Sequence, residues 1–472
     1  MKEKPAFNKQ TSGVLTLLGD PRKAIWRLAV PMVIAMSIQT IYNLADAIWV
    51  SGINREALAA VGYFFPFMML TIAISVGLGV GGGSAISRSI GARDKITAEK
   101  TAEHMLVIMA AVSVLFTLFM LIFQKYFFTL MGVGSSIEET LAYSTIMFAG
   151  TFAAFFPQIA NSILRSEGDA NRAMYAMLFG AVSNIILDPL FIFSFKIPFL
   201  NLNFGLNLGI AGAAYATVLS MVFSTILCSY WLFIKKDTFV DFHFKVFRWD
   251  TKIISNIINV GLPATIAQAS MSIMMFSIIK VISIVSGDSG VAVFNAGWRI
   301  VMIAILPMLG MGTAVTAVCG AAYGARSIEK IKTAYRYAVS LGFVAEIAIA
   351  VLTFVFAPII VKAFTWSEDT HALAGDITVM LRIMSLSYPA IVNGILSSHM
   401  FQGTGNGMVS LFLTIIRTIL LASFLAWLFG IFFGWGQTGV YWAIILSNMS
   451  TSLISMVWVQ IFYRQKEKLW AE

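Results

Sequence analysis

The stretch that decides the fold is Arg22–Ser51, RKAIWRLAVPMVIAMSIQTIYNLADAIWVS. It is long enough to cross a bilayer as one helix, because about 20 apolar residues suffice. It contains a proline, Pro31, and a carboxylate, Asp46. A charged residue inside a membrane span is rare and usually marks a transport pathway or a proton relay. The stretch therefore predicts a membrane-spanning helix whose acid has a function.

The composition extends this interpretation to the whole chain. Of its 472 residues, 58% are hydrophobic and only 12% are charged, whereas a soluble domain carries about 25% charged residues. The net charge of +9 comes from basic residues between apolar runs, which indicates a lipid bilayer and not nucleic acid as the partner. Cys228 and Cys319 both lie in apolar segments and predict no disulfide framework.

Twelve apolar segments are long enough to be spans, and the predicted fold class is an all-α polytopic membrane protein. The expected spans are residues 24–51, 58–90, 102–124, 138–163, 172–195, 208–234, 253–284, 290–321, 335–361, 376–400, 408–432 and 438–463.

The loops between these segments differ in basic residues. One side of the predicted membrane receives both termini and 24 Lys or Arg residues, whereas the other side receives only Arg55, Lys125, Lys196 and Lys362. Cytoplasmic loops carry the excess of basic residues. We therefore expect a multi-pass protein of the cell membrane with both termini in the cytoplasm.

The chain also repeats itself at a nearly constant offset. Pro31 returns as Pro263, the Gly-Ala-Arg that ends at Arg93 returns at Arg326, and Asn161 of FPQIANSIL returns as Asn393 of YPAIVNGIL. These offsets of 232 or 233 residues predict two six-helix bundles in parallel orientation.

We expect five regions from this repeat. They are a cytoplasmic tail (1–21), a first lobe (22–234), a cytoplasmic linker (235–252), a second lobe (253–463) and a short cytoplasmic tail (464–472). The linker is aromatic and basic, which predicts an amphipathic segment on the lipid surface.

Asp46 ends a polar stripe on the first helix. Gln39, Tyr42 and Asn43 lie seven, four and three residues before it and therefore share its face. One interpretation is a structural carboxylate that is hydrogen-bonded between helices. The one we favour is a protonation or cation site, with the stripe lining a substrate path or gate.

Asp188 is the second candidate acid, in the run SNIILDPL. Asn184 lies one turn earlier on the same face, and Pro189 removes the donor that the Ile185 carbonyl would use in a helix. A carboxylate, an amide and a freed carbonyl suit a proton or a small hard cation such as Na⁺. The alternative is that Pro189 only bends the helix and Asp188 caps the bend.

The second half lacks counterparts of both acids, since an offset near 232 places Ile278 over Asp46 and one near 235 places Ser423 over Asp188. Glu346 is its only acid deep within a span. Glu346 and Lys280 are therefore expected to form either a buried pair or a second site. Pro31 and Pro263 are each either a fixed kink or a hinge.

Other chemistry is excluded by missing motifs. Gly77, Gly79 and Gly82 match a dinucleotide-binding pattern, but no predicted strand precedes them. No Walker motif appears, and the four histidines show no metal-ligand spacing. We expect no enzyme activity and no cofactor other than H⁺ or Na⁺ as a coupling ion.

Taken together, these motifs resemble the multidrug and toxic compound extrusion (MATE) family. The resemblance rests on LAVP at Pro31, GAR after the second and eighth spans, LRSEGDAN from Leu164, NIILDP from Asn184 and GAAYAT from Gly212. It implies two six-helix bundles in a V shape around a central cavity. It also implies extrusion of small organic, often cationic, compounds in exchange for H⁺ or Na⁺, by a chain that we expect to be monomeric.

An acid at Asp46 together with Asn184–Pro189 looks like the DinF-like branch of that family. The resemblance implies an ion-coupling cluster of Asp46, Asn184, Asp188 and Thr217, with Tyr143 nearby and Pro31 as the bending point. The chain departs from the NorM-like branch, which keeps acids in the second lobe.

Two other functions fit the sequence less well. A flippase for lipids or lipid-linked oligosaccharides belongs to the same superfamily, but it would need a cavity rich in arginine, and the spans contain few. A membrane enzyme would need clustered His, Asp or Glu at one membrane face, which the sequence does not show.

Overall fold

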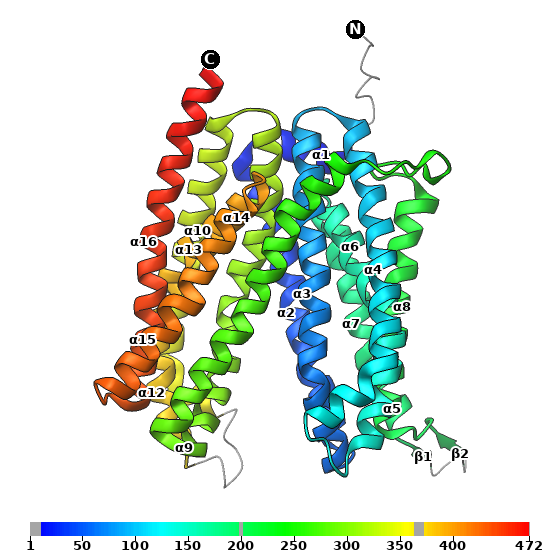
Figure 1. The fold of residues 1–472 in the computed structure, drawn as a ribbon, viewed down its shortest axis with the longest axis vertical. Helices are drawn as coiled ribbons and strands as arrows, with labels where there is room; N and C mark the ends of the chain where they lie inside the picture. The colour runs from blue at the N-terminus through cyan, green and yellow to red at the C-terminus, as the bar shows by residue number, and fades with distance from the viewer. Residues whose placement is uncertain (1–10, 198–201, 363–371, 472) are drawn as a thin grey trace. The chain divides into compact units, whose positions relative to one another are not determined.

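Long helices make up most of the computed structural model, which describes residues 11–197, 202–362 and 372–471 (Figure 1). The helices of the first half are α1 (Ser12–Leu18), α2 (Pro21–Ser51), α3 (Arg55–Gly91), α4 (Lys95–Leu130), α5 (Ile137–Ala149), α6 (Thr151–Ser166), α7 (Ala170–Ile192) and α8 (Gly209–Ser229), which a π-helical turn, η1 (Tyr230–Lys235), extends. Between α7 and α8, strands β1 (Phe195–Ile197) and β2 (Leu202–Phe204) pair in antiparallel orientation.

The second half follows a short 3-10 turn, η2 (Phe244–Val246). Its helices are α9 (Thr251–Gly324), α10 (Ile328–Lys362), α12 (Ala374–Ser385), α13 (Tyr388–Gly403), α14 (Gly407–Ile415), α15 (Phe424–Trp427) and α16 (Gly436–Ala471), with π-helical segments η3 (Ile416–Ser423) before and η4 (Leu428–Phe432) after α15.

These helices confirm the polytopic all-α fold. Within the described residues, nine helices are long and apolar enough to cross a membrane, and the bent pairs α5–α6 (45°) and α12–α13 (54°) bring the number to eleven. The long helix α9 is interrupted at Gly287, whose φ of 60° and ψ of −157° are not helical. Because α9 therefore contains two spans, the twelve predicted segments all have a counterpart.

The helices fall into two compact units. Unit 1 holds Ile34–Ile86 and Asp94–Gly261 together with the chain up to Leu15, and unit 2 holds Thr16–Val33, Ser87–Arg93 and Leu262–Glu472. Along α2 the division follows Val33, two residues after Pro31, and along α9 it precedes Leu262, next to Pro263. Both repeated prolines thus lie where a helix passes from one unit into the other.

The backbone repeats as the sequence does. Arg93 and Arg326, which end the two Gly-Ala-Arg motifs, have positive φ values of 56° and 52°. Such values are uncommon outside glycine, so their recurrence at the same place in both halves is evidence for duplicated structure. In the first half Asp94 then caps α4, accepting the backbone N–H of Thr97 at 3.1 Å.

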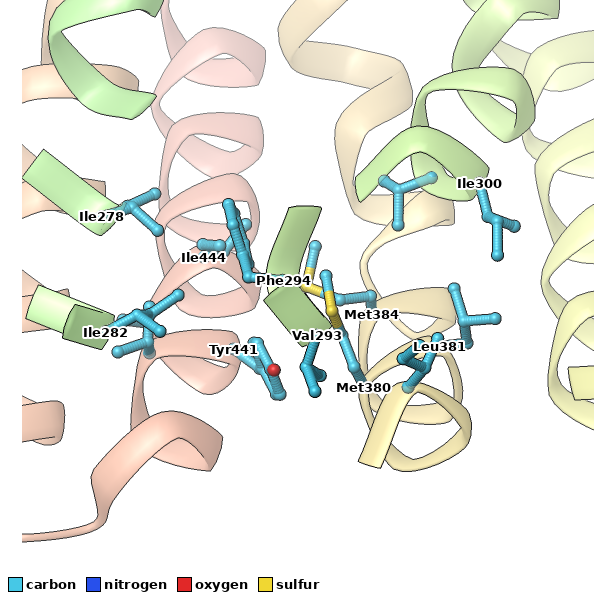
Figure 2. Close-up of a cluster of buried hydrophobic side chains, with 14 of the residues drawn as sticks. Ile278, Ile282, Val293, Phe294, Ile300, Met380, Leu381, Met384, Tyr441 and Ile444 are labelled. Atoms are coloured by element: carbon cyan, nitrogen blue, oxygen red, sulfur yellow. The ribbon is translucent and has the colours of Figure 1, made fainter. Parts of the chain in front are cut away.

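Each unit has its own apolar core. In unit 1, Phe64, Phe128 and Phe148 are among the buried side chains that pack together near Tyr143. In unit 2, the buried cluster includes Ile278 and Ile282 of α9, and Figure 2 shows it extending past Val293 and Phe294 to Met380 and Met384 of α12 and to Tyr441 and Ile444 of α16. Between membrane helices such side chains stabilise the packing through close van der Waals contact, because lipid tails are as apolar as the side chains themselves.

The linker is attached to unit 1 through its backbone. Phe239 and Val240 are fully buried, and both of their backbone N–H groups donate to Glu167, at 2.8 and 3.0 Å. The N–H of His243 donates to Glu103 at 2.6 Å. The first part of the linker therefore packs on unit 1. Its predicted position on a lipid surface stays a prediction.

Candidate functional site

Helix α2 presents the predicted stripe without interruption. It is helical from Pro21 to Ser51, so Tyr42 lies one turn before Asp46 on the same face. Both side chains are half-buried. Helix α2 therefore carries two groups of the site, the Asp46 carboxylate and the Tyr42 hydroxyl.

Helix α7 supplies the second acid. Asn184 and Asp188 are both fully buried, and the Asn184 amide donates to Asp188 Oδ1 at 3.0 Å. Pro189 lies within the helix, which continues to Ile192. Asn184 and Asp188 are one turn apart, so the amide and the carboxylate meet without any distortion of the backbone.

Two further helices complete the cluster. The Asn184 amide also donates to Thr217 Oγ1 of α8 at 3.3 Å, and the Tyr42 hydroxyl lies near Thr217. Tyr143 of α5 lies near enough to interact electrostatically with Asp46 and Asp188. Its ring packs edge-on against Phe64 at 5.3 Å. Helices α2, α5, α7 and α8 of unit 1 thus converge on one polar cluster.

The electrostatics of this cluster are unusual for a membrane interior. Asp46 and Asp188 interact with each other, and in the described chain no Lys or Arg forms an ion pair with either. Asp188 Oδ2 and Asn184 Oδ1 are buried without a hydrogen-bond partner. Two neighbouring carboxylates in a low-dielectric site repel each other. Either one of them takes up a proton, or a cation binds between them. The unpartnered oxygens are the atoms that would bind one.

The remaining predicted residues lie outside this cluster. Gln39 is half-buried and Asn43 is exposed, and neither makes a side-chain hydrogen bond within the described residues. Pro31 is buried in the part of α2 that belongs to unit 2.

The acid of the second half stands apart from its predicted partner. Glu346 is 1% exposed and lies near the Tyr388 ring, and neither of its carboxylate oxygens has a hydrogen-bond partner. Lys280 is exposed. Among the ion pairs of the described chain none joins these two residues, so the structure does not contain the buried pair; the second site stays a prediction.

Trp49 is a further residue near Asp46 that the sequence motifs do not identify. It lies three residues after Asp46, and therefore on the same face of α2, and its indole N–H is buried without a hydrogen-bond partner. The ring stacks edge-on against Phe193 at 6.3 Å. Its spacing of three residues from Asp46 indicates that the two share a face. A buried indole N–H normally has an acceptor, so a tryptophan at this spacing is a candidate neighbour of the carboxylate.

Comparisons with known proteins identify the family of the chain. The MatE family model matches residues 31–190 and 263–428. The multidrug export protein MepA of Staphylococcus saprophyticus is 24% identical over 95% of this chain and 94% of its own length. The probable multidrug resistance protein YoeA of Bacillus subtilis is 25% identical over 81% of this chain and 82% of its own.

Solved structures are more similar still. A transporter of the MOP superfamily from Pyrococcus furiosus, described as having a binding pocket of reverse polarity, is 44% identical, with a TM-score of 0.92 over 98% of this chain and 100% of that chain. A multidrug resistance MATE family transporter in its outward-facing conformation is 43% identical, with a TM-score of 0.91 over 97% and 99%. The two matched segments, one in each half, and these solved relatives lead to one conclusion: this chain is a multi-pass membrane protein that belongs to the MatE family of transporters.

Proposed function

We propose that this chain is a secondary active multidrug efflux antiporter, which exports small organic, often cationic, compounds in exchange for H⁺ or Na⁺. The observation that carries the proposal is the pair of acids, Asp46 and Asp188, which interact inside unit 1 without a basic partner. The relatives named as multidrug export proteins support the class of substrate. The Asp46 and Asn184–Pro189 motifs favour the DinF-like branch.

In the proposed mechanism the ion and the substrate compete for the acid pair. Asn184 holds Asp188 in place, because its amide donates hydrogen bonds to Asp188 at 3.0 Å and to Thr217 at 3.3 Å. Entry of a proton or of Na⁺ lowers the negative charge of the pair, so that an organic cation loses its counter-charge and leaves. For net transport the ion must bind one conformation better than the other.

Bending of α2 at Pro31 is the proposed conformational change. Pro31 lacks an N–H, so the carbonyl of Arg27 has no helical donor. The part of α2 that belongs to unit 2 ends at Val33, two residues after Pro31, and the rest of the helix belongs to unit 1. With both termini in the cytoplasm, as the basic residues favour, Pro31 lies in the cytoplasmic half of α2, and Asp46 lies further along the same helix.

The test is efflux of a fluorescent organic cation, such as ethidium, from proteoliposomes. A proton gradient and a sodium gradient are imposed separately, on wild type, on Asp46→Asn and on Asp288→Asn. Asp288 is an exposed acid of unit 2, so its variant makes the same chemical change away from the site. We expect one gradient to drive efflux in wild type and in Asp288→Asn, and neither gradient to drive it in Asp46→Asn.

Two results would count against the proposal. Normal efflux by Asp46→Asn would remove the acid from the coupling mechanism. Failure of both gradients to move any organic cation in wild type would contradict drug efflux, and the lipid or lipid-linked oligosaccharide flippase would become the hypothesis to test.

A further inference from the structure

The linker carries three exposed basic side chains that the proposed antiport does not use. They are Lys245, Arg248 and Lys252. Among the ion pairs of the described chain none includes any of the three. Their charges are therefore available to a partner outside the protein.

The acids of the same segment are already engaged. Asp237 forms ion pairs within unit 1, Asp241 pairs with Lys95 at 2.8 Å, and the carboxylate of Asp250 accepts two backbone N–H groups at the start of α9. Residues 235–252 contain five Lys or Arg and only these three acids. The linker therefore keeps an excess of positive charge, and its exposed basic groups have the sign that attracts an anionic partner.

Two exposed aromatic side chains relate this part of the linker to the ends of membrane spans. Phe244 is 45% exposed and Trp249 is 61% exposed. The Phe244 ring lies 6.3 Å from that of Phe233, which is two residues before the end of the candidate span Gly209–Lys235. Trp249 lies two residues before the candidate span that begins at Thr251. Tryptophan is enriched where a membrane meets water, so these positions favour a linker that follows the membrane–water interface from one span to the next.

The opposite face of the linker is fixed to unit 1, as the bonds to Glu167 and Glu103 show. Further along, the N–H of Asp250 donates to Nε2 of the fully buried His104 at 3.0 Å. The Phe247 ring packs on the His104 ring at 4.8 Å. Because the backbone is held on both sides of Arg248, the outer side chains lose little further freedom when they bind a partner.

We propose that the outer face of the linker binds the headgroups of anionic phospholipids in the cytoplasmic leaflet. This face consists of Phe244, Lys245, Arg248, Trp249 and Lys252. Basic residues next to a span attract anionic headgroups, and the aromatic rings enter the boundary between headgroups and acyl chains. The composition of the linker predicts contact with lipid, and the contacts of its buried face now specify which side chains make it and which lipid charge they select. The site does not involve the acid pair.

The test uses a fluorophore beside the proposed site in the purified full chain in detergent. Thr251→Cys, at an exposed position, is labelled with a nitrobenzoxadiazole, whose emission shifts to the blue next to lipid. The native cysteines, Cys228 and Cys319, are buried and stay unlabelled. The protein is titrated with phosphatidylglycerol and, separately, with phosphatidylcholine of the same acyl chains. We expect phosphatidylglycerol to shift the emission at the lower concentration.

Removal of two charges separates this site from general attraction. Lys245→Gln combined with Arg248→Gln raises the phosphatidylglycerol concentration at half-shift by about tenfold or more, because each basic residue next to anionic lipid is worth about fivefold in affinity. It leaves the phosphatidylcholine response unchanged. Arg93→Gln combined with Arg326→Gln removes the same charge at two other exposed arginines and leaves both responses unchanged.

Three results would overturn the proposal. They are equal responses of the labelled protein to the two lipids, an unchanged phosphatidylglycerol response after loss of Lys245 and Arg248, and an equal loss in the control pair. If the Lys245→Gln and Arg248→Gln protein does not fold, salt decides in its place. Rising NaCl must weaken the response to phosphatidylglycerol and not that to phosphatidylcholine, and a salt-independent difference would also overturn the proposal. Ethidium efflux is measured separately, so failure of this site leaves the proposed function untouched.

Discussion

Asn184 is the residue on which the geometry of the acid pair depends. Its single amide donates to both Asp188 and Thr217, and so it joins α7 to α8 at the buried carboxylate. A buried carboxylate that loses its only donor is free to turn away from its position. Asn184 is therefore a positioning residue in the proposed mechanism, whereas Asp46 and Asp188 would bind the ion.

We predict that Asn184→Ala lowers gradient-driven ethidium efflux by about tenfold or more, because loss of a hydrogen bond to a charged group is worth about 1.5–3 kcal/mol. Asn256→Ala, the same change at an exposed position of α9, serves as the control and retains wild-type efflux. Both variants are measured in the same proteoliposome assay. Wild-type efflux by Asn184→Ala would show that Asp188 needs no positioning by α7.

At the residue scale, charge within apolar sequence was the informative signal. It identified Asp46 and Asp188 without a structure, and the spacing of a turn identified Asn184 and Tyr42. Thr217 lies near Asn184 and Tyr42, but the three residues are on different helices. Spacing along the chain therefore could not predict these contacts.

At the scale of elements, the linker after η1 is held by carboxylates that bind its backbone. Glu167 is 2% exposed and accepts two N–H groups. We predict that Glu167→Ala lowers the free energy of unfolding by about 2–4 kcal/mol, since it leaves two buried donors without acceptors. Glu99→Ala removes one backbone hydrogen bond of 3.3 Å and a partly exposed ion pair with Lys95 of 3.2 Å, and it is expected to have the smaller effect.

The measurement is the thermal unfolding midpoint of the purified protein. Limited proteolysis within residues 237–250 gives a second readout, because release of the linker exposes its backbone. Equal midpoints for Glu167→Ala and wild type would contradict the account of how the linker is attached.

The start of the linker should also respond to pH. Partial burial alone would raise the pKa of Asp237, but hydrogen bonds and charges from Lys235 and Arg172 outweigh it and hold that pKa below its ordinary value of 3.8. Because the folded state has the lower pKa, the stabilisation is complete above pH 3.8 and is lost as pH falls through the folded pKa. We predict that the difference in unfolding midpoint between wild type and Asp237→Asn is largest near neutral pH and shrinks below pH 3.8. A difference that is constant with pH would contradict this ion pair.

Helix α2 carries the prediction about motion. Replacing Pro31 by alanine restores a backbone donor and stiffens the helix beside the passage between units. We expect Pro31→Ala to keep or raise the unfolding midpoint and to slow ethidium efflux several-fold. Pro358→Ala in α10 is a matched change at a proline inside another long helix and should leave efflux unchanged. Equal efflux for Pro31→Ala and wild type would make Pro31 a fixed kink.

Apolar length and turn residues were sufficient to predict the elements themselves. Every predicted span has a helical counterpart, and Gly287, which interrupts α9, falls between the two spans expected there. The π-helical segments η3 and η4 and the β1–β2 hairpin were not predicted. Their hydrogen-bond register is set by packing against neighbouring helices, which hydropathy does not encode.

For the whole molecule, the two halves share backbone features, but the acidic side chains of the first half are not repeated in the second. The repeated positive φ values at Arg93 and Arg326 show how closely the two halves correspond. Yet the position that corresponds to Asp46 is Ile278, which lies fully buried in the apolar core of unit 2 (Figure 2). Ion coupling is therefore proposed for the acid pair of unit 1.

The most direct test of the central claim is ion displacement on substrate binding. Ethidium is added to the purified protein in weakly buffered, sodium-free solution, and released protons are measured; the affinity is then measured again at increasing Na⁺. We predict that binding releases protons or is weakened competitively by Na⁺, and that Asp46→Asn and Asp188→Asn each abolish the effect. Ethidium binding to wild type without proton release and without competition by Na⁺ would contradict exchange of ion and substrate at the acid pair.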